Sequence, residues 1–305
     1  MKKVSVVVPC YNEEETIEKF YNAIHKLWED INNYELELLF IDDGSKDKTI
    51  ELIRSISEED SHVRYSSFSR NFGKEAAIFC GLKQATGDSV VVIDADLQHP
   101  ITTIPNMIEK WEEGYDVIEG IKSERGNESV SHGLMAKFFY KMMGKMTGFD
   151  MNNSSDFKLL DRKVVDALNQ LEEKVTFFRA LTFWVGFKST YVEYDVHERS
   201  GGATKWNSRS LMKYAIYNLT SFTYAPLYCI LWLGAIVIFI GVILGIDAII
   251  SYIQGKTVGG YPSLVILIIL SVGAIITILG IIAVYLARMF EEIKGRPRYF
   301  VREDK

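Results

Sequence analysis

The chain has 305 residues, which suits one large domain or two small ones, and its formal net charge at pH 7 is −6. This mildly acidic balance excludes a generally basic nucleic-acid-binding protein, so we expect no nucleic acid among its partners. The three cysteines are odd in number and widely spaced, which predicts neither a disulfide framework nor a cysteine metal site.

The N-terminal part alternates apolar runs with segments of helical spacing. Its opening residues, Met1–Pro9, predict a strand and a turn rather than a signal peptide. Apolar strands that alternate with helices are typical of a parallel sheet covered on both faces. The expected strands are 4–9, 36–43, 63–68, 90–94 and 116–120, and the expected helices are 13–28, 48–56, 74–85 and 103–111. Residues 123–131 are polar and predict a surface loop.

The C-terminal part is far more apolar. Residues 208–224 predict an amphipathic helix, which would lie at a membrane interface or pack against the preceding domain. Two uncharged stretches follow, Leu227–Ile246 and Ser263–Ala287. Each is long enough to cross the roughly 30 Å hydrocarbon core of a bilayer, and soluble core helices rarely stay uncharged over such a length. We therefore expect transmembrane helices at 225–250 and 263–287.

Basic residues flank these two stretches. Lys256 is the one basic residue of the connecting loop, 251–262. The others are Lys205, Arg209 and Lys213 on the N-terminal side and Arg288, Lys294, Arg296, Arg298 and Arg302 on the C-terminal side. Because basic flanks stay in the cytoplasm, we expect a multi-pass plasma-membrane protein. Its domain, both termini and the basic tail 288–305 would be cytoplasmic, and the loop would be external.

Acidic residues collect just after the expected strands, at Glu13, Asp42, Asp43, Asp94 and Asp96. Ligands of parallel sheets bind beyond the carboxyl ends of the strands. Asp-x-Asp alone is a weak motif, since surface turns are rich in aspartate. Here Asp94 and Asp96 can share one cation, and the amide oxygen of Gln98 can add a third ligand. Such hard oxygen ligands suit Mg²⁺ or Mn²⁺, and magnesium usually bridges to substrate phosphates.

The sequence contains, in this order, PCYNEEETI, FIDDGSKDKT, RNFGKEAA, DADLQHP and RSGGATKW. Together these segments resemble the inverting GT-A glycosyltransferases of the dolichol-phosphate mannose synthase and bacterial polyprenyl-phosphate (bactoprenol) glycosyltransferase branch. The resemblance runs from Val4 to about Trp206, and DADLQHP is its most specific part. It implies an α/β GT-A domain with a Rossmann-like, mostly parallel sheet at residues 1–207, followed by a two-helix membrane anchor.

The resemblance also implies a donor site for a UDP-sugar. Its residues would be Pro9, Tyr11, Glu13, Asp42, Lys74, Asp94, Asp96, Arg199 and Lys205. The first three would border the nucleobase and ribose, and Asp42 would accept hydrogen bonds from the uracil or ribose. Asp94 would face the ribose and the metal, while Asp96 and Gln98 would hold the metal against the diphosphate. Arg199 and Lys205 would reach the same phosphates from a glycine-rich loop that closes over the ligand.

These residues also have plainer interpretations. Tyr11 and Glu13 suit an ordinary helix start, where the helix dipole favours acids. The basic loop with Arg199 and Lys205 suits a segment attracted to anionic lipid, and both roles can hold together.

For the acceptor, the resemblance places the lipid phosphate near Lys122 and Arg125, with the hydroxyl of Ser129. Relatives often carry a further arginine near residues 131–133, where this chain has His132. The candidates to replace that arginine are Lys137 and Lys141.

Two aspartates would be catalytic, Asp96 through the metal and Asp156 as the family's proposed base. The alternative for Asp156 is a helix N-cap, for which Asp161 is the better candidate. A lipid monophosphate has a second pKa of about 6 and is mostly dianionic at neutral pH. We therefore expect Asp156 to orient the acceptor or the sugar at least as much as to remove a proton.

The predicted reaction moves a hexose from a UDP-sugar to polyprenyl (undecaprenyl) phosphate, giving a β-linked phosphosugar for cell-envelope glycosylation. Glucose, N-acetylglucosamine and galactose all remain open. One alternative is a processive polysaccharide synthase, which usually shows a QxxRW segment and more spans, and this chain has neither. The other is a non-catalytic nucleotide-binding scaffold, which would have little use for the metal motif. We expect a separate flippase and a downstream transferase, and small residues on the second span allow a homo-oligomer.

Overall fold

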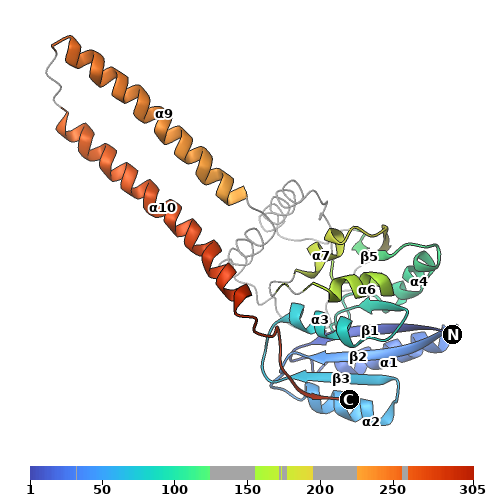
Figure 1. Ribbon diagram of the computed structural model, residues 1–305. Helices are drawn as coiled ribbons and strands as arrows, with labels where there is room; N and C mark the ends of the chain where they lie inside the picture. Colours follow the sequence, from blue (N-terminus) through green and yellow to red (C-terminus); the bar gives the residue numbers. More distant parts are fainter. Residues whose placement is uncertain (32, 124–154, 172, 174–176, 195–224, 256–259) are drawn as a thin grey trace. The chain divides into compact units, whose positions relative to one another are not determined.

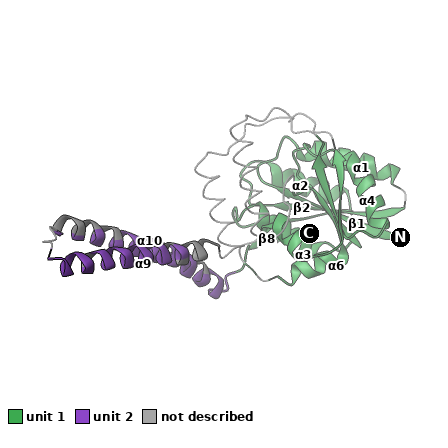
Figure 2. Ribbon diagram, turned by 90° about the horizontal axis from the view of Figure 1, so that it is seen from above, with its two compact units in different colours: residues 1–207, 297–305 green, residues 208–296 purple. Residues whose placement is uncertain are grey.

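The computed structural model describes residues 1–31, 33–123, 155–171, 173, 177–194, 225–255 and 260–305. The chain divides into two compact units, one of residues 1–207 together with 297–305 and the other of residues 208–296 (Figure 2). The amphipathic helix expected at 208–224 lies outside the described residues, as does most of the loop expected at 123–131.

The first unit is built on an eight-stranded sheet in the order β7-β5-β6-β4-β1-β2-β3-β8. Figure 1 labels four of these strands, β1, β2, β3 and β5. The strands are β1 Lys2–Cys10, β2 Tyr34–Asp42, β3 Val63–Phe68, β4 Ser89–Val92, β5 Val117–Lys122, β6 Lys158–Asp161, β7 Ser189–Tyr194 and β8 Val301–Asp304. Strand β6 runs antiparallel to β4 and β5, and β8 runs antiparallel to β3. The other pairings are parallel, which confirms a mostly parallel sheet.

Helices cover the sheet because its central strands are apolar on both sides. They are α1 Ile17–Asp30, α2 Thr49–Glu59, α3 Lys74–Gln84, α4 Ile104–Glu112, α6 Arg162–Asn169 and α7 Phe178–Trp184, with a short 3₁₀ turn at Ile101–Thr103. Val6 and Val8 of β1 pack with Phe20 of α1 in the main core cluster. On the other face α3 lies directly on the strand, since a Cβ at Gly81 would come within 2.2 Å of Val7. This contact fixes the helix that begins at Lys74.

The nine elements predicted for the N-terminal part are all present, with ends that differ by a few residues. Asp161 is confirmed as an N-cap, since its side chain accepts a hydrogen bond from the backbone N–H of Lys163 at the start of α6. Apart from this helix start, strands β6, β7 and β8 and helix α7 were not predicted. Strand β8 is the largest difference from the predicted fold, because it places the C-terminus in the sheet of the first unit.

The described part of the second unit consists of two long helices, α9 Ala225–Ile253 and α10 Tyr261–Ile293. Their segments Gly234–Ile253 and Ser271–Ile293 are long and apolar enough to cross a membrane. Neither segment is buried within the protein. The predicted spans, 225–250 and 263–287, therefore fall on helices of suitable length and composition.

Candidate active site

The DADLQHP segment forms a tight turn after β4. Leu97 adopts a positive φ of 59°, which is costly for a residue other than glycine, and such strain clusters at functional sites. The turn is closed by the backbone N–H of Gln98, which donates to Oδ1 of Asp96 at 3.1 Å. The half-buried His99 lies 2.6 Å from the hydroxyl of Tyr194 and 3.7 Å from Asp94. The motif is thus held from both sides, with Asp94 and Asp96 partly exposed to solvent.

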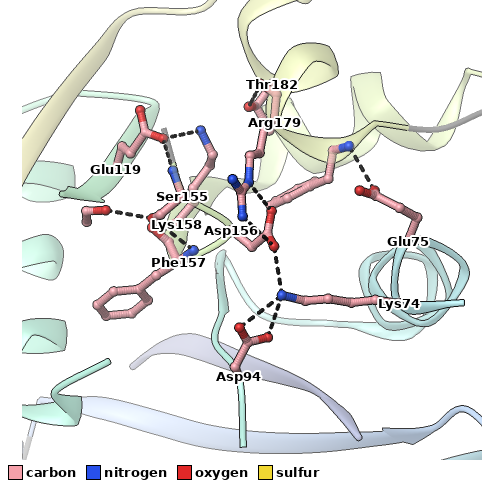
Figure 3. Close-up of polar contacts among 12 residues, drawn as sticks. Lys74, Glu75, Asp94, Glu119, Ser155, Asp156, Phe157, Lys158, Arg179 and Thr182 are labelled. Carbon is pink, nitrogen blue, oxygen red and sulfur yellow. Dashed lines mark hydrogen bonds and ion pairs between the residues drawn. The ribbon is translucent and has the colours of Figure 1, made fainter. Parts of the chain in front are cut away.

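A chain of ion pairs leads from this turn to Asp156 (Figure 3). The ammonium of Lys74 lies 2.7 Å from Oδ1 and 2.9 Å from Oδ2 of Asp94, and 2.7 Å from Oδ2 of Asp156. Arg179, at the start of α7, donates to both oxygens of Asp156, with Nε at 2.7 Å from Oδ1 and Nη2 at 3.1 Å from Oδ2. Two cations and two carboxylates therefore alternate, and Asp156 is bonded on both sides.

The segment that carries Asp156 is pinned to the neighbouring strand. The backbone N–H of Ser155 donates to Glu119 at 2.8 Å, and the hydroxyl of Ser155 donates to the carbonyl of Gly120 at 2.6 Å. The fully buried ammonium of Lys158 lies 2.8 Å from the same carboxylate of Glu119. These bonds flank Asp156 in sequence (Figure 3), so its carboxylate has little freedom to move.

Arg179 is also held in place. Glu75, the residue after Lys74, accepts a hydrogen bond from the backbone N–H of Phe178 at 2.8 Å. The rings of Phe178 and Phe79 pack edge to face with their centroids 6.4 Å apart. Burial, with the charge of Asp156 in the same direction, raises the pKa of Glu75 to about 8. Glu75 thus ties α3 to the start of α7, next to Arg179.

The ion pairs determine the charge of Asp156. Burial acts to raise the pKa of this carboxyl, but the charges of Lys74 and Arg179 outweigh burial and hold the pKa well below its ordinary range. Burial also acts to raise the pKa of Asp94, and the charge of Lys74 outweighs it and lowers that pKa. Burial acts to lower the pKa of the Lys74 ammonium, but the charges of Asp94 and Asp156 outweigh burial and raise it. A general base works best when its pKa lies near the operating pH, so Asp156 is poorly suited to that role.

The residues predicted to bind a metal have suitable chemistry. Asp94, Asp96 and Gln98 offer two carboxylates and an amide oxygen, and the low pKa of Asp94 keeps it in the ionised form that a ligand needs. Among the described residues, three or more His, Cys, Asp or Glu side chains nowhere gather into a metal site. A site with two carboxylates fits magnesium, which retains waters and bridges to phosphates. A metal at Asp94 would share that carboxylate with Lys74.

The structure brings the predicted nucleotide-binding residues to the same edge, where β1 and β2 end. Asp42 is completely buried, and its oxygens accept hydrogen bonds from the backbone N–H of Ser45 at 3.0 Å and from the hydroxyl of Ser67 at 2.6 Å. Pro9 lies near the end of the buried strand β1, and Tyr11, just after that strand, is 40% exposed. Their contacts with a nucleotide stay predictions.

Glu13 takes part in the start of α1. Its carboxylate accepts a hydrogen bond from the hydroxyl of Thr16 at 2.8 Å, and its backbone N–H donates to Thr49 of α2. Asn12, which has a positive φ of 55°, donates its backbone N–H to Ser45. The first two sequence motifs are therefore bonded to each other.

Several predicted residues lie outside the described part of the chain. They are Arg125, Ser129, His132, Lys137 and Lys141 of the acceptor side and Arg199 and Lys205 of the glycine-rich loop. Lys122 is described and ends β5, where it pairs with Tyr194 of β7. Its proposed contact with the lipid phosphate stays a prediction.

The role of Arg179 could not be predicted from the sequence. The residue sits in the segment FFRAL, which carries no motif and lies 23 positions after its partner Asp156. A lone arginine among aromatic residues is a weak signal for an ion pair with a buried acid. Glu75 lies in the RNFGKEAA segment, but its contact with Phe178 depends on the packing of α7 against α3, which the residue spacing does not indicate.

Comparison with known proteins identifies the family. The glycosyl transferase family 2 domain matches residues 5–168. The chain belongs to this family. It is therefore a glycosyltransferase with the GT-A fold, as the sequence motifs predicted.

Similar proteins extend along the whole chain. An uncharacterized glycosyltransferase of Bacillus subtilis (strain 168) is 39% identical over 98% of this chain and 93% of its own length. The prophage bactoprenol glucosyl transferase homolog of Escherichia coli (strain K12) is 39% identical over 99% of both chains. The bactoprenol glucosyl transferase of Shigella phage SfX is 39% identical over 99% of this chain and 100% of its own.

Solved structures are more distant. Glucosyl-3-phosphoglycerate synthase of Mycobacterium tuberculosis, crystallised with Mn²⁺, UDP and glucosyl-3-phosphoglycerate, superposes with a TM-score of 0.49. It is 22% identical and covers 70% of this chain and 76% of its own.

The charge of Asp156 predicts a particular pH profile for Asp156→Asn. The wild-type carboxylate is ionised between about pH 5.5 and 8.5. Its pKa lies below the ordinary aspartate value of about 4, so the group takes up a proton only at a pH below that value. The amide loses the attraction to Lys74 and Arg179 at every pH in that range. We expect kcat/KM for sugar transfer to fall by about a hundredfold, as misplacement of substrates can cause, and the deficit to be uniform.

A base role would give a different profile. As the pH rises above the second pKa of the acceptor phosphate, about 6, the acceptor no longer needs to lose a proton. Recovery of Asp156→Asn toward the wild-type rate at the upper end would contradict the positioning role.

The bidentate contact of Arg179 predicts that lysine is a poor substitute. An ammonium cannot reproduce two parallel N–H···O bonds, so Arg179→Lys should lower kcat by about tenfold and Arg179→Ala by more. Lys163→Ala, which removes a 55% exposed cation paired with Asp116, is the matched control. Wild-type turnover in Arg179→Ala would show that Lys74 alone suffices to hold Asp156.

Proposed function

We propose that this glycosyltransferase moves a hexose from a UDP-sugar to polyprenyl phosphate, namely undecaprenyl phosphate, on the cytoplasmic face of the plasma membrane. The observation that carries the proposal is the extent of the similarity to proteins named bactoprenol glucosyl transferase. It covers 99% of this chain and therefore includes both apolar helices as well as the sheet domain. A catalytic domain linked to such helices suits an acceptor that is itself embedded in lipid.

The reaction would be an in-line displacement at the anomeric carbon. An oxygen of the acceptor phosphate forms the new C–O bond, the bond to UDP breaks, and its electron pair leaves with UDP. An α-linked donor thus gives a β-linked lipid phosphosugar. The acceptor is mostly a dianion at neutral pH, so the step requires no proton transfer. The low pKa of Asp156 fits a mechanism that has little need of a base.

The chain's own residues would then align the two substrates, which is a large part of catalysis in such reactions. Asp156, held by Lys74 and Arg179, would orient the sugar or the acceptor between them. Lys74 also contacts Asp94 and so links the position of Asp156 to the donor side. A divalent cation, Mg²⁺ or Mn²⁺, held by Asp94, Asp96 and Gln98 would stabilise the charge on the UDP leaving group.

Two observations support the proposed membrane topology. The basic flanks of the apolar helices favour the cytoplasm for both ends. In addition, the first unit contains residues on both sides of the helical segment, since β8 pairs with β3. If the helices cross a membrane, the chain must therefore cross it an even number of times. Two crossings, by α9 and α10, meet this requirement.

A transfer assay tests the proposed function. Membranes that contain the protein should move label from one UDP-hexose, among UDP-glucose, UDP-N-acetylglucosamine and UDP-galactose, to undecaprenyl phosphate. EDTA and Asp96→Ala should each abolish transfer, because both remove the cation that stabilises the leaving group. The control is Glu113→Ala, which removes an exposed carboxylate just after the C-terminal end of α4 and should leave transfer unchanged.

The same assay contains the outcomes that would refute the proposal. Label in a long polysaccharide would indicate a processive synthase, and UDP binding without transfer would indicate a scaffold. Full transfer in metal-free buffer would exclude the role assigned to Asp96.

The topology predicts where an impermeant thiol reagent can reach. A cysteine placed at Gly259, between the two helices, should be labelled from outside intact cells, and one placed at Lys305 should be labelled only after the cells are opened. Labelling of the Lys305 position from outside intact cells would place the catalytic domain outside the cell and contradict the proposed topology.

A further inference from the structure

The last residues of the chain form a strap, residues 298–305, that lies along β3. Strand β8 pairs antiparallel with β3, and the guanidinium of Arg54 on α2 binds Glu303 at 2.9 Å. The ring of Tyr299 stacks on Phe68, with the centroids 4.8 Å apart and the planes 9° from parallel. Phe68 is completely buried, so this stack joins the strap to the core of the domain rather than to its surface.

The strap then reaches the loop 69–73, which connects β3 to α3. The backbone N–H of Ser69 donates to the carbonyl of Phe300 at 3.0 Å. The ring of Phe300 packs on Phe72 with the centroids 6.1 Å apart, and Phe72 also packs edge to face on Phe68 at 5.9 Å. Three aromatic residues and a backbone bond thus brace one side of the loop.

Asp43 braces the opposite side. Its two oxygens accept hydrogen bonds from the backbone N–H groups of Phe72 at 2.6 Å and Gly73 at 2.9 Å. The next residue is Lys74, whose ammonium lies between Asp94 and Asp156. The loop is therefore held between a carboxylate of β2's end and the strap, and it leads straight into the ion pairs of the site.

We propose that Tyr299 and Phe300 are positioning residues for the transfer reaction, which hold the loop 69–73 and through it the ammonium of Lys74. The inference rests on the catalytic part that the proposed function gives to Lys74. The strap begins a few residues after α10, so the segment that returns from the apolar helix completes the active-site support. The domain by itself, cut before residue 208, would lack this support.

Phe300→Ala separates positioning from general stability, because Phe300 is 56% exposed and its loss should leave the core intact. In the full chain without substrate, we expect amide hydrogen exchange in residues 69–73 to become about three- to tenfold faster, the size expected for one lost aromatic pair. Exchange in β1 and α1 should not change. Turnover should fall about tenfold, since small displacements of groups in the active site are costly.

Matched variants complete the test. Phe300→Tyr keeps the ring and should restore both the exchange pattern and kcat. Asp304→Ala removes an exposed side chain of the same strap and should behave as the wild type.

Three results would overturn the inference. They are unchanged exchange in residues 69–73 of Phe300→Ala, unchanged kcat in that variant, and faster exchange spread evenly over the domain, which would indicate a purely structural role. If the wild type transfers no sugar to undecaprenyl phosphate, the proposed acceptor is wrong. The exchange measurement, made without substrate, still shows whether the strap holds the loop.

Discussion

The alternation of charges through Lys74, Asp156 and Arg179 is the interaction on which the rest of the site depends. A buried carboxylate is costly unless it is paired and hydrogen-bonded. Asp156 has a cation on each side, with Lys74 at 2.7 Å and Arg179 in a two-bond contact. Because removing one partner leaves an uncompensated charge, the arrangement constrains every element that contributes to it. Helices α3 and α7 and the segment before β6 have to meet at one point.

The same arrangement explains the chemistry that we assign to the site. A carboxylate that is always ionised and rigidly held orients groups well and accepts protons poorly. A phosphate acceptor that is already a dianion has little need of a base. Lys74 connects this carboxylate to Asp94, and so joins the part of the site proposed to bind the acceptor to the part proposed to bind the metal and UDP. Positioning and charge, rather than proton transfer, are then the main contributions of the protein.

Much of this architecture could be predicted from the sequence. The apolar runs and helical spacing predicted every strand and α-helix up to β5, and acids after the strands predicted the edge of the sheet at which Asp42, Asp94 and Asp96 lie. Those features are local, because each strand and its terminal acids are adjacent in sequence. The packing of Val7 against Gly81 then follows once α3 is laid on β1.

The rest depends on contacts between residues far apart in the chain. Arg179 is set by Glu75 and Phe178, and nothing in FFRAL indicates that α7 will pack there. Strand β8 is a short, charged segment, Val-Arg-Glu-Asp, which alone resembles a solvated tail. It becomes a strand because β3 leaves an open edge and Phe68 offers a ring for Tyr299. Residues 288–305 were predicted to form a basic tail, and the pairing of its last part with the sheet was not foreseen.

The most direct test of the account is the protonation state of Asp156 itself. Infrared difference spectra of wild type and Asp156→Asn, with and without ¹³C-labelled aspartate, isolate the protonated carboxyl band of this residue. Between about pH 5 and 8, a range above the ordinary aspartate pKa of about 4, we predict that no such band appears, because Lys74 and Arg179 keep the group ionised. A carboxyl band that titrates within this range would show that Lys74 and Arg179 do not hold the pKa of Asp156 low, and would contradict the account.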